Sequence, residues 1–156
     1  MSTLKDLLNV AIKQEQNSQK LYRKGMDIAQ DEDSKKFFKR LHDEEVEHEK
    51  MLYNIRETEL YDLDVEIKDP ELLEMARSSH GSDDLYLPED LSLQDVLEMA
   101  MKRENTARLR YEKAAALAKE DEVKELLSNL AREEENHRLH VEKYYKMHKG
   151  LFGEEI

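Results

Sequence analysis

The motif Glu-x-x-His occurs twice in the sequence, as Glu45 with His48 and as Glu134 with His137. Residues three apart lie on one face of a helix, so each motif offers a carboxylate and an imidazole to the same point. All four residues fall where the helical period calls for an apolar residue that faces a core. A buried ionised carboxylate is strongly destabilising without a partner. Binding of divalent metal ions is the chemistry that these residues favour.

The two motifs belong to an internal repeat. A shift of 89 positions places the second motif on the first, and one further Glu lies 30 residues before each motif. The sequence therefore predicts six metal ligands, three from each half of the chain: Glu15, Glu45, His48, Glu104, Glu134 and His137.

Charge balance indicates how many metal ions these ligands would hold. Four carboxylates, two neutral imidazoles and two divalent cations sum to zero charge, whereas without metal several carboxylates would have to take up protons. Oxygen and imidazole ligands suit iron or manganese, with zinc as an alternative, and the sequence contains no Cys to supply a thiolate. We expect two iron ions bridged by carboxylates.

Two antiparallel helical hairpins are needed to bring the six residues together. In the first, at about 3–58, Thr3 and Asp6 form a helix-capping pattern. The polar segment 30–33 predicts a tight turn, and Ser34 starts a second helix that ends near Thr58.

A long crossover is expected at 59–91, where the helical pattern stops. Pro70 suits the first position of a short helix that ends near Arg77. A connection of this length lets the third long helix run parallel to the second. The sequence predicts one all-α domain over 1–156, an antiparallel four-helix bundle with one crossover.

The second hairpin, at about 92–149, repeats the first. Ser92 with Asp95 caps its first helix. Its second helix follows a turn at 120–121 and ends with Gly150 as its C-terminal cap.

Four residues around the ligands have open roles. Tyr22 and Tyr111 follow a ligand Glu by seven residues on the same face. Each either packs in the core or also donates a hydrogen bond to a ligand carboxylate. Glu44 and Glu133 precede the ligand Glu of each motif but leave the apolar stripe, so we interpret them as flanking residues that support the ligands.

Composition excludes several other classes of protein. Charged residues make up 40% of the chain and the net charge is −12, which disfavours binding to nucleic acid. No apolar run is long enough to span a membrane, and the first residues lack the pattern of a signal peptide. We expect a cytoplasmic protein that binds neither nucleic acid nor membrane.

The ligand pattern resembles that of the ferritin-like di-iron carboxylate superfamily, and most of all the ferritin-like domain of rubrerythrins. The resemblance covers nearly the whole chain and includes Tyr22. It implies a ferritin-like bundle and an oxidoreductase that reduces peroxide or O₂ in defence against oxidative stress. An iron-oxidising or iron-storing protein is the second possibility, and a bundle that the metals only stabilise is the third.

Two departures from the rubrerythrin pattern stand out. Rubrerythrins usually carry a further ligand Glu one turn after the third-helix ligand, where this chain has Ala107. With Ser18, this small residue either leaves room for a small molecule or lets the helices approach. The Cys-rich rubredoxin domain of many rubrerythrins is missing, so electrons would come from an external donor protein.

A homodimer is expected from the resemblance and from four apolar residues. These residues lie off the main stripe and widen the apolar faces of the first and third long helices. They are Val10, Ile12, Met99 and Met101.

Overall fold

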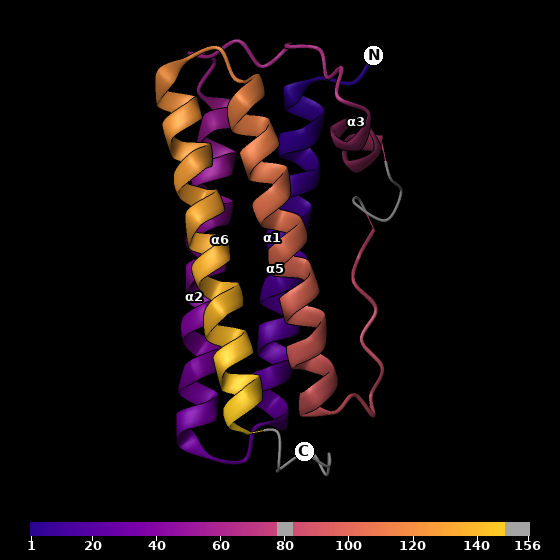
Figure 1. Ribbon diagram of the computed structural model, residues 1–156, viewed down its shortest axis with the longest axis vertical. Helices are drawn as coiled ribbons and strands as arrows, with labels where there is room; N and C mark the ends of the chain where they lie inside the picture. The colour runs from indigo at the N-terminus through magenta and orange to yellow at the C-terminus, as the bar shows by residue number, and fades with distance from the viewer. Residues whose placement is uncertain (78–82, 149–156) are drawn as a thin grey trace.

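The computed structural model describes residues 1–77 and 83–148. Within these residues the chain forms four long helices, one short helix and no strand beyond an isolated bridge, which confirms the all-α prediction (Figure 1). The helices are α1 (Leu4–Ile28), α2 (Glu32–Glu57), α3 (Pro70–Arg77), α5 (Leu93–Leu117) and α6 (Asp121–Met147).

The long helices form two antiparallel hairpins, α1 with α2 and α5 with α6 (Figure 1). After α2, the chain passes through α3 at one end of the bundle and runs back along its length before α5 begins at the other end. As predicted, α5 therefore runs parallel to α2.

Capping side chains set the starts of α1 and α5. Thr3 accepts a hydrogen bond from the backbone N–H of Asp6 at 3.4 Å, and the Asp6 carboxylate accepts one from the Thr3 N–H at 2.9 Å. Ser92 and Asp95 form the same reciprocal pair at 3.1 and 3.2 Å. Both predicted caps are confirmed, and they fix the register of the helices that carry the first ligand of each hairpin.

The predicted start of α2 at Ser34 is wrong. Asp31 is the N-cap, and its carboxylate accepts hydrogen bonds from the N–H of Ser34 at 3.0 Å and from its hydroxyl at 2.7 Å. Asp and Ser are comparable caps, so the sequence pattern did not distinguish two candidates three residues apart. At the other end of the chain, α6 ends at Met147, and the predicted cap Gly150 lies outside the described residues.

Two clusters of buried apolar side chains lie at opposite ends of the bundle. One includes Leu8, Leu52 and Leu127, and the other includes Phe38 and Val141. The predicted ligands lie between these clusters along the helices.

The apolar faces expected to support a homodimer are not free. Val10 and Ile12 are only 6% and 7% exposed within the single chain. Met99 and Met101 are partly buried against the cluster that contains Phe38. The sequence could not show this burial, because it depends on how the bundle and the crossover pack. The homodimer therefore stays a prediction without this support.

Helices α1 and α2 approach closely at Gly25. A Cβ atom there would lie 2.6 to 2.8 Å from three carbons of the Phe38 ring. We expect Gly25→Ala to lower the free energy of unfolding by about 1–3 kcal/mol through overpacking, although Ala is the better helix former. Urea unfolding measures the effect. Gly25→Ala should cost less stability in a Phe38→Leu background than in the original protein. A Gly25→Ala variant as stable as the original would contradict the close approach.

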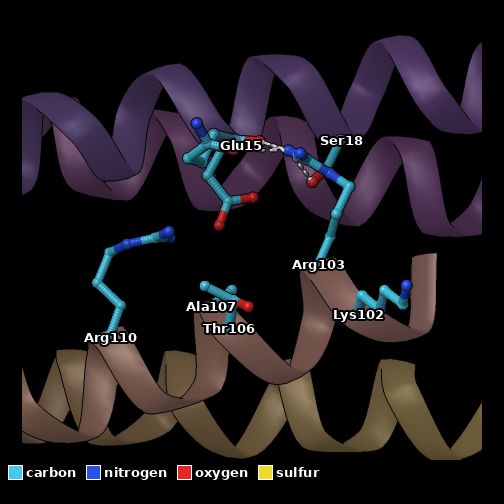
Figure 2. A pocket seen from close by; sticks show the side chains of 8 residues that line it. Glu15, Ser18, Lys102, Arg103, Thr106, Ala107 and Arg110 are labelled. Carbon is cyan, nitrogen blue, oxygen red and sulfur yellow. Dashed lines mark hydrogen bonds between the residues drawn. The ribbon is translucent and has the colours of Figure 1, made fainter. Parts of the chain in front are cut away.

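Helices α1 and α5 form the walls of a partly open cavity of about 160 Å³ beside Glu15 (Figure 2). Ser18 and Ala107 line this cavity. The small residues therefore leave open space between the helices, which is one of the two roles that the sequence suggested for them.

Candidate metal centre

The six predicted ligands meet in the middle of the bundle, and each is at most 4% exposed. Their ligand atoms form two overlapping groups, and within each group the atoms lie within 4.8 Å of one another. The first group is Glu15, Glu45, His48 and Glu134, and the second is Glu45, Glu104, Glu134 and His137. Glu45 and Glu134 belong to both groups, which is the arrangement expected for carboxylates shared between two metal ions.

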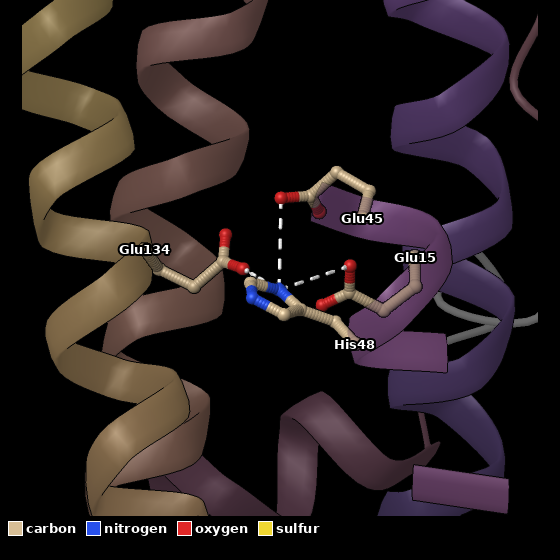
Figure 3. Close-up of side chains that lie close together, drawn as sticks. All are labelled: Glu15, Glu45, His48 and Glu134. Atoms are coloured by element: carbon tan, nitrogen blue, oxygen red, sulfur yellow. Dashed lines mark ion pairs between the residues drawn. The ribbon is translucent and has the colours of Figure 1, made fainter. Parts of the chain in front are cut away.

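The two halves of the centre have nearly the same geometry. Nδ1 of His48 lies 2.7 Å from a carboxylate oxygen of Glu134 and 3.7 Å from one of Glu15 (Figure 3). In the other half, Nδ1 of His137 lies 2.8 Å from Glu45 and 3.6 Å from Glu104. The two imidazole rings are nearly parallel, at 13°, with their centroids 5.6 Å apart.

Each of the six residues has one buried nitrogen or oxygen atom without a hydrogen-bond partner among the described residues. Four of these atoms approach one another in pairs, His48 with Glu134 at 2.7 Å and His137 with Glu45 at 2.8 Å, which are ion pairs only if the imidazole is protonated. Buried polar atoms normally have a partner, and a shared cation would satisfy all six. These atoms are Oε2 of Glu15, Oε1 of Glu45, Nδ1 of His48, Oε2 of Glu104, Oε1 of Glu134 and Nδ1 of His137. The donor set is that of a metal site with oxygen and imidazole ligands.

The two tyrosines donate hydrogen bonds to the ligands of the opposite hairpin. Tyr111 on α5 donates to Oε1 of Glu15 on α1 at 2.5 Å, and Tyr22 on α1 donates to Oε1 of Glu104 on α5. Burial and the charges of nearby Glu residues raise the pKa of both phenols well above the usual value, so they stay neutral donors. Each phenol occupies one carboxylate oxygen and leaves the other for the centre.

Glu44 and Glu133 also act across the hairpins. Glu44 on α2 pairs with Nε2 of His137 on α6, and Glu133 on α6 lies 3.3 Å from Nε2 of His48 on α2. A carboxylate on the outer nitrogen orients the ring and makes the inner nitrogen a better ligand. The sequence showed that these residues occupy equivalent positions of the repeat but not which His each would contact.

Protonation of the metal-free centre follows from its burial. Burial and the neighbouring carboxylates raise the pKa of Glu45 and of Glu134 well above the usual value. Burial also raises the pKa of Glu15, but its contacts with Glu45 and His48 outweigh burial and lower it to about 2. Burial lowers the pKa of His137, but Glu104 and Glu44 outweigh it and raise the pKa to about 10. The centre holds protons where divalent cations would otherwise balance the carboxylates.

We expect Tyr111→Phe to lower the free energy of unfolding of the metal-free protein by about 1–3 kcal/mol, because a buried carboxylate oxygen loses its donor. Tyr22→Phe should have a similar effect through Glu104. Thermal unfolding measures both. The control is Tyr53→Phe, since Tyr53 is 51% exposed. Equal stabilities for all three variants would show that the phenols do not hold the ligands.

Comparison with solved structures supports the fold. The chain resembles a hypothetical protein from Pyrococcus furiosus, with a TM-score of 0.72, 24% identity, and coverage of 92% of this chain and 89% of that chain. It also resembles a dodecameric thioferritin, a bacterioferritin-related protein from Bacteroides fragilis, with a TM-score of 0.70, 20% identity, and coverage of 96% and 88%. These likenesses show a ferritin-like bundle.

Among the described residues, no helix has the length and apolar character to cross a membrane.

Comparison of sequences gives the family. No curated protein matches the chain significantly. The model of the Rubrerythrin family matches residues 6–145, which is most of the sequence. The chain therefore belongs to the Rubrerythrin family.

Proposed function

We propose that the centre holds two iron ions. The observation that carries this proposal is the set of six buried ligand atoms without partners, one from each predicted ligand. Glu15 and His48 would bind one ion and Glu104 and His137 the other, while Glu45 and Glu134 would bind both. Manganese or zinc would suit the same atoms, so the identity of the metal rests on membership of the family.

We further propose that the protein is an oxidoreductase that reduces hydrogen peroxide or O₂ with electrons from an external donor protein. Two ferrous ions would supply the two electrons of the reaction H₂O₂ + 2 H⁺ + 2 e⁻ → 2 H₂O. The protein's own part is to hold the ligands in place. Tyr22 and Tyr111 fix two carboxylates, Glu44 and Glu133 orient the imidazoles, and apolar clusters pack on both sides of the ligands along the bundle.

Iron oxidation and storage is the alternative function. A groove of about 620 Å³ runs between α2 and α6, and the predicted ligand His48 lies in its wall. Acidic and basic side chains line the groove, and the acidic ones nearest to His48 in the sequence are Glu44 and Glu47. Carboxylates along a path to a ligand suit the entry of Fe²⁺. The similar protein from Bacteroides fragilis is a thioferritin, which also fits this function.

Stopped-flow mixing of the di-ferrous protein separates these functions. Rapid oxidation of two ferrous ions by one H₂O₂, reversible by a reductant over many cycles, supports a peroxidase, and the same test with O₂ identifies the preferred oxidant. Accumulation of iron well beyond two per chain supports storage. Absence of reaction with either oxidant would leave the metals a structural function and contradict the proposal.

We propose that the chain assembles, most simply as a homodimer. Support comes from the family, and the similar thioferritin is a dodecamer. Sedimentation at micromolar concentration measures the assembled mass. A value near 18.5 kDa, the mass of one chain, would contradict assembly, and a twelve-fold mass would favour storage.

A further inference from the structure

Two arginines on α5, the buried Arg110 and the partly buried Arg103, form no ion pair with a carboxylate among the described residues. Arg110 is 6% exposed, and its Nε has no hydrogen-bond partner among the described residues. Nε of Arg103 is also buried without a partner. One terminal nitrogen of Arg103 donates only to neutral oxygens, which belong to Gln14 at 2.9 and 3.0 Å and to Ser18 at 3.3 Å. Burial lowers the pKa of both guanidinium groups, as expected where charge is poorly compensated.

The neighbouring Arg108 differs from these two arginines in its ion pairs, although its Nε is likewise buried without a hydrogen-bond partner among the described residues. Arg108 lies between them on the same helix and forms ion pairs with Glu112 at 2.9 Å and with Glu135 at 3.1 Å. The chain carries 37 acidic against 25 basic residues, so carboxylates are abundant. A buried cation without a direct ion pair is costly, and the protein keeps Arg110 and the partly buried Arg103 beside one cavity with only longer-range attraction to the carboxylates of the metal centre.

Both guanidinium groups reach into the cavity between α1 and α5 (Figure 2). Lys102 adds a third cation to the wall, and Ser18 and Thr106 add hydroxyl groups. Glu15 is the one acidic residue in the wall of this cavity. Its Oε1 accepts a hydrogen bond from Tyr111, and its Oε2 is one of the six atoms expected to bind metal.

We propose that this cavity binds a small inorganic oxyanion of the size and charge of phosphate. The volume of about 160 Å³ exceeds that of a single water, about 30 Å³, several-fold, so a phosphate ion fits with room for water. Guanidinium groups recognise oxyanions through paired N–H donors, and the hydroxyls of Ser18 and Thr106 complete the donor set. The site depends on the arginines and not on the metals, although it shares Glu15 with the metal centre.

Titration calorimetry with inorganic phosphate at physiological chloride tests the proposal, on the protein as isolated and again after chelation of metals. We expect one saturable site per chain in both forms. Arg110→Gln and Arg103→Gln should each weaken binding by at least about tenfold. The control is Arg23→Gln, which removes the same charge from an exposed position on α1 and should change the affinity less than about twofold. Circular dichroism verifies that each variant folds. Arg103→Gln is the second variant in case Arg110→Gln does not fold, because Arg103 is the less buried of the two positions.

Three results would overturn the site. The first is absence of saturable binding. The second is binding that the arginine variants leave unchanged, or that disappears on chelation, which would place phosphate on a metal ion. The third is a protein that binds no phosphate but whose sedimentation changes in the variant Arg110→Gln. This result would show that the arginines form ion pairs with a carboxylate from a second copy of the chain.

Discussion

Glu134→Ala should reduce the iron content of the loaded protein from about two ions per chain to nearly none, whereas His48→Ala should leave about one. The reason is the overlap between the two groups of ligand atoms. Glu134 offers an oxygen to both groups, but His48 belongs to one. Loss of a shared carboxylate removes a ligand from each ion and leaves an excess of positive charge between them.

Metal analysis after anaerobic loading with Fe²⁺ and removal of free iron measures this difference. Glu125→Ala is the matched control, because it removes an exposed carboxylate from the same helix. Two ions retained by Glu134→Ala, with the helices intact, would contradict a shared ligand. Equal losses in Glu134→Ala and His48→Ala would show that the two ions bind only as a pair.

The metal-free protein should become less stable as the pH rises from about 6.5 to 10. His137 has a folded pKa of about 10 against an ordinary 6.5, and the pKa values of Glu45 and Glu134 are also raised. In this range the folded protein binds more protons than the unfolded chain, so the stability present below the ordinary pKa values is lost as the pH rises. Each extra bound proton contributes a slope of about 1.4 kcal/mol per pH unit, so the total loss amounts to several kcal/mol. The lowered pKa of Glu15 acts in the opposite direction, but only below pH 4.5.

Thermal unfolding with and without metal, at several pH values, tests this expectation. Metal replaces the protons, so the stability of the loaded protein should fall much less as the pH rises. The affinity for metal should increase with pH for the same reason. Glu134→Gln removes one titrating carboxyl group and should both raise the stability of the metal-free protein and flatten its pH dependence. A metal-free protein whose stability rises over this range would show that the carboxylates are already ionised.

The sequence predicted which six side chains meet in the middle of the bundle because two rigid periodicities determine their positions. The helical period places Glu45 and His48 on one face, and the repeat gives Glu134 and His137 the same environment. The short helix at Pro70 and the caps at Thr3 and Ser92 followed from local hydrogen bonding, which needs no knowledge of the rest of the chain.

The sequence did not predict the contacts between the two hairpins. Whether Tyr22 would bond to Glu104 depends on how far two helices are rotated against each other, and the helical period of each does not determine this rotation. The burial of Val10 has the same origin, since it depends on the packing of the whole chain. The unpaired charge of Arg110 was equally hidden, because the sequence shows many acidic residues but not which of them are within reach.

The exchange of supporting side chains between hairpins has a consequence for the order of folding. Tyr22 and Glu104 are 82 residues apart, Glu44 and His137 are 93 apart, and Glu15 and Tyr111 are 96 apart. Each hairpin is made of local contacts and can form early, but neither alone presents a supported carboxylate or an oriented imidazole to iron. We therefore expect iron to be captured only after the hairpins dock, so that it slows unfolding and leaves the rate of folding unchanged.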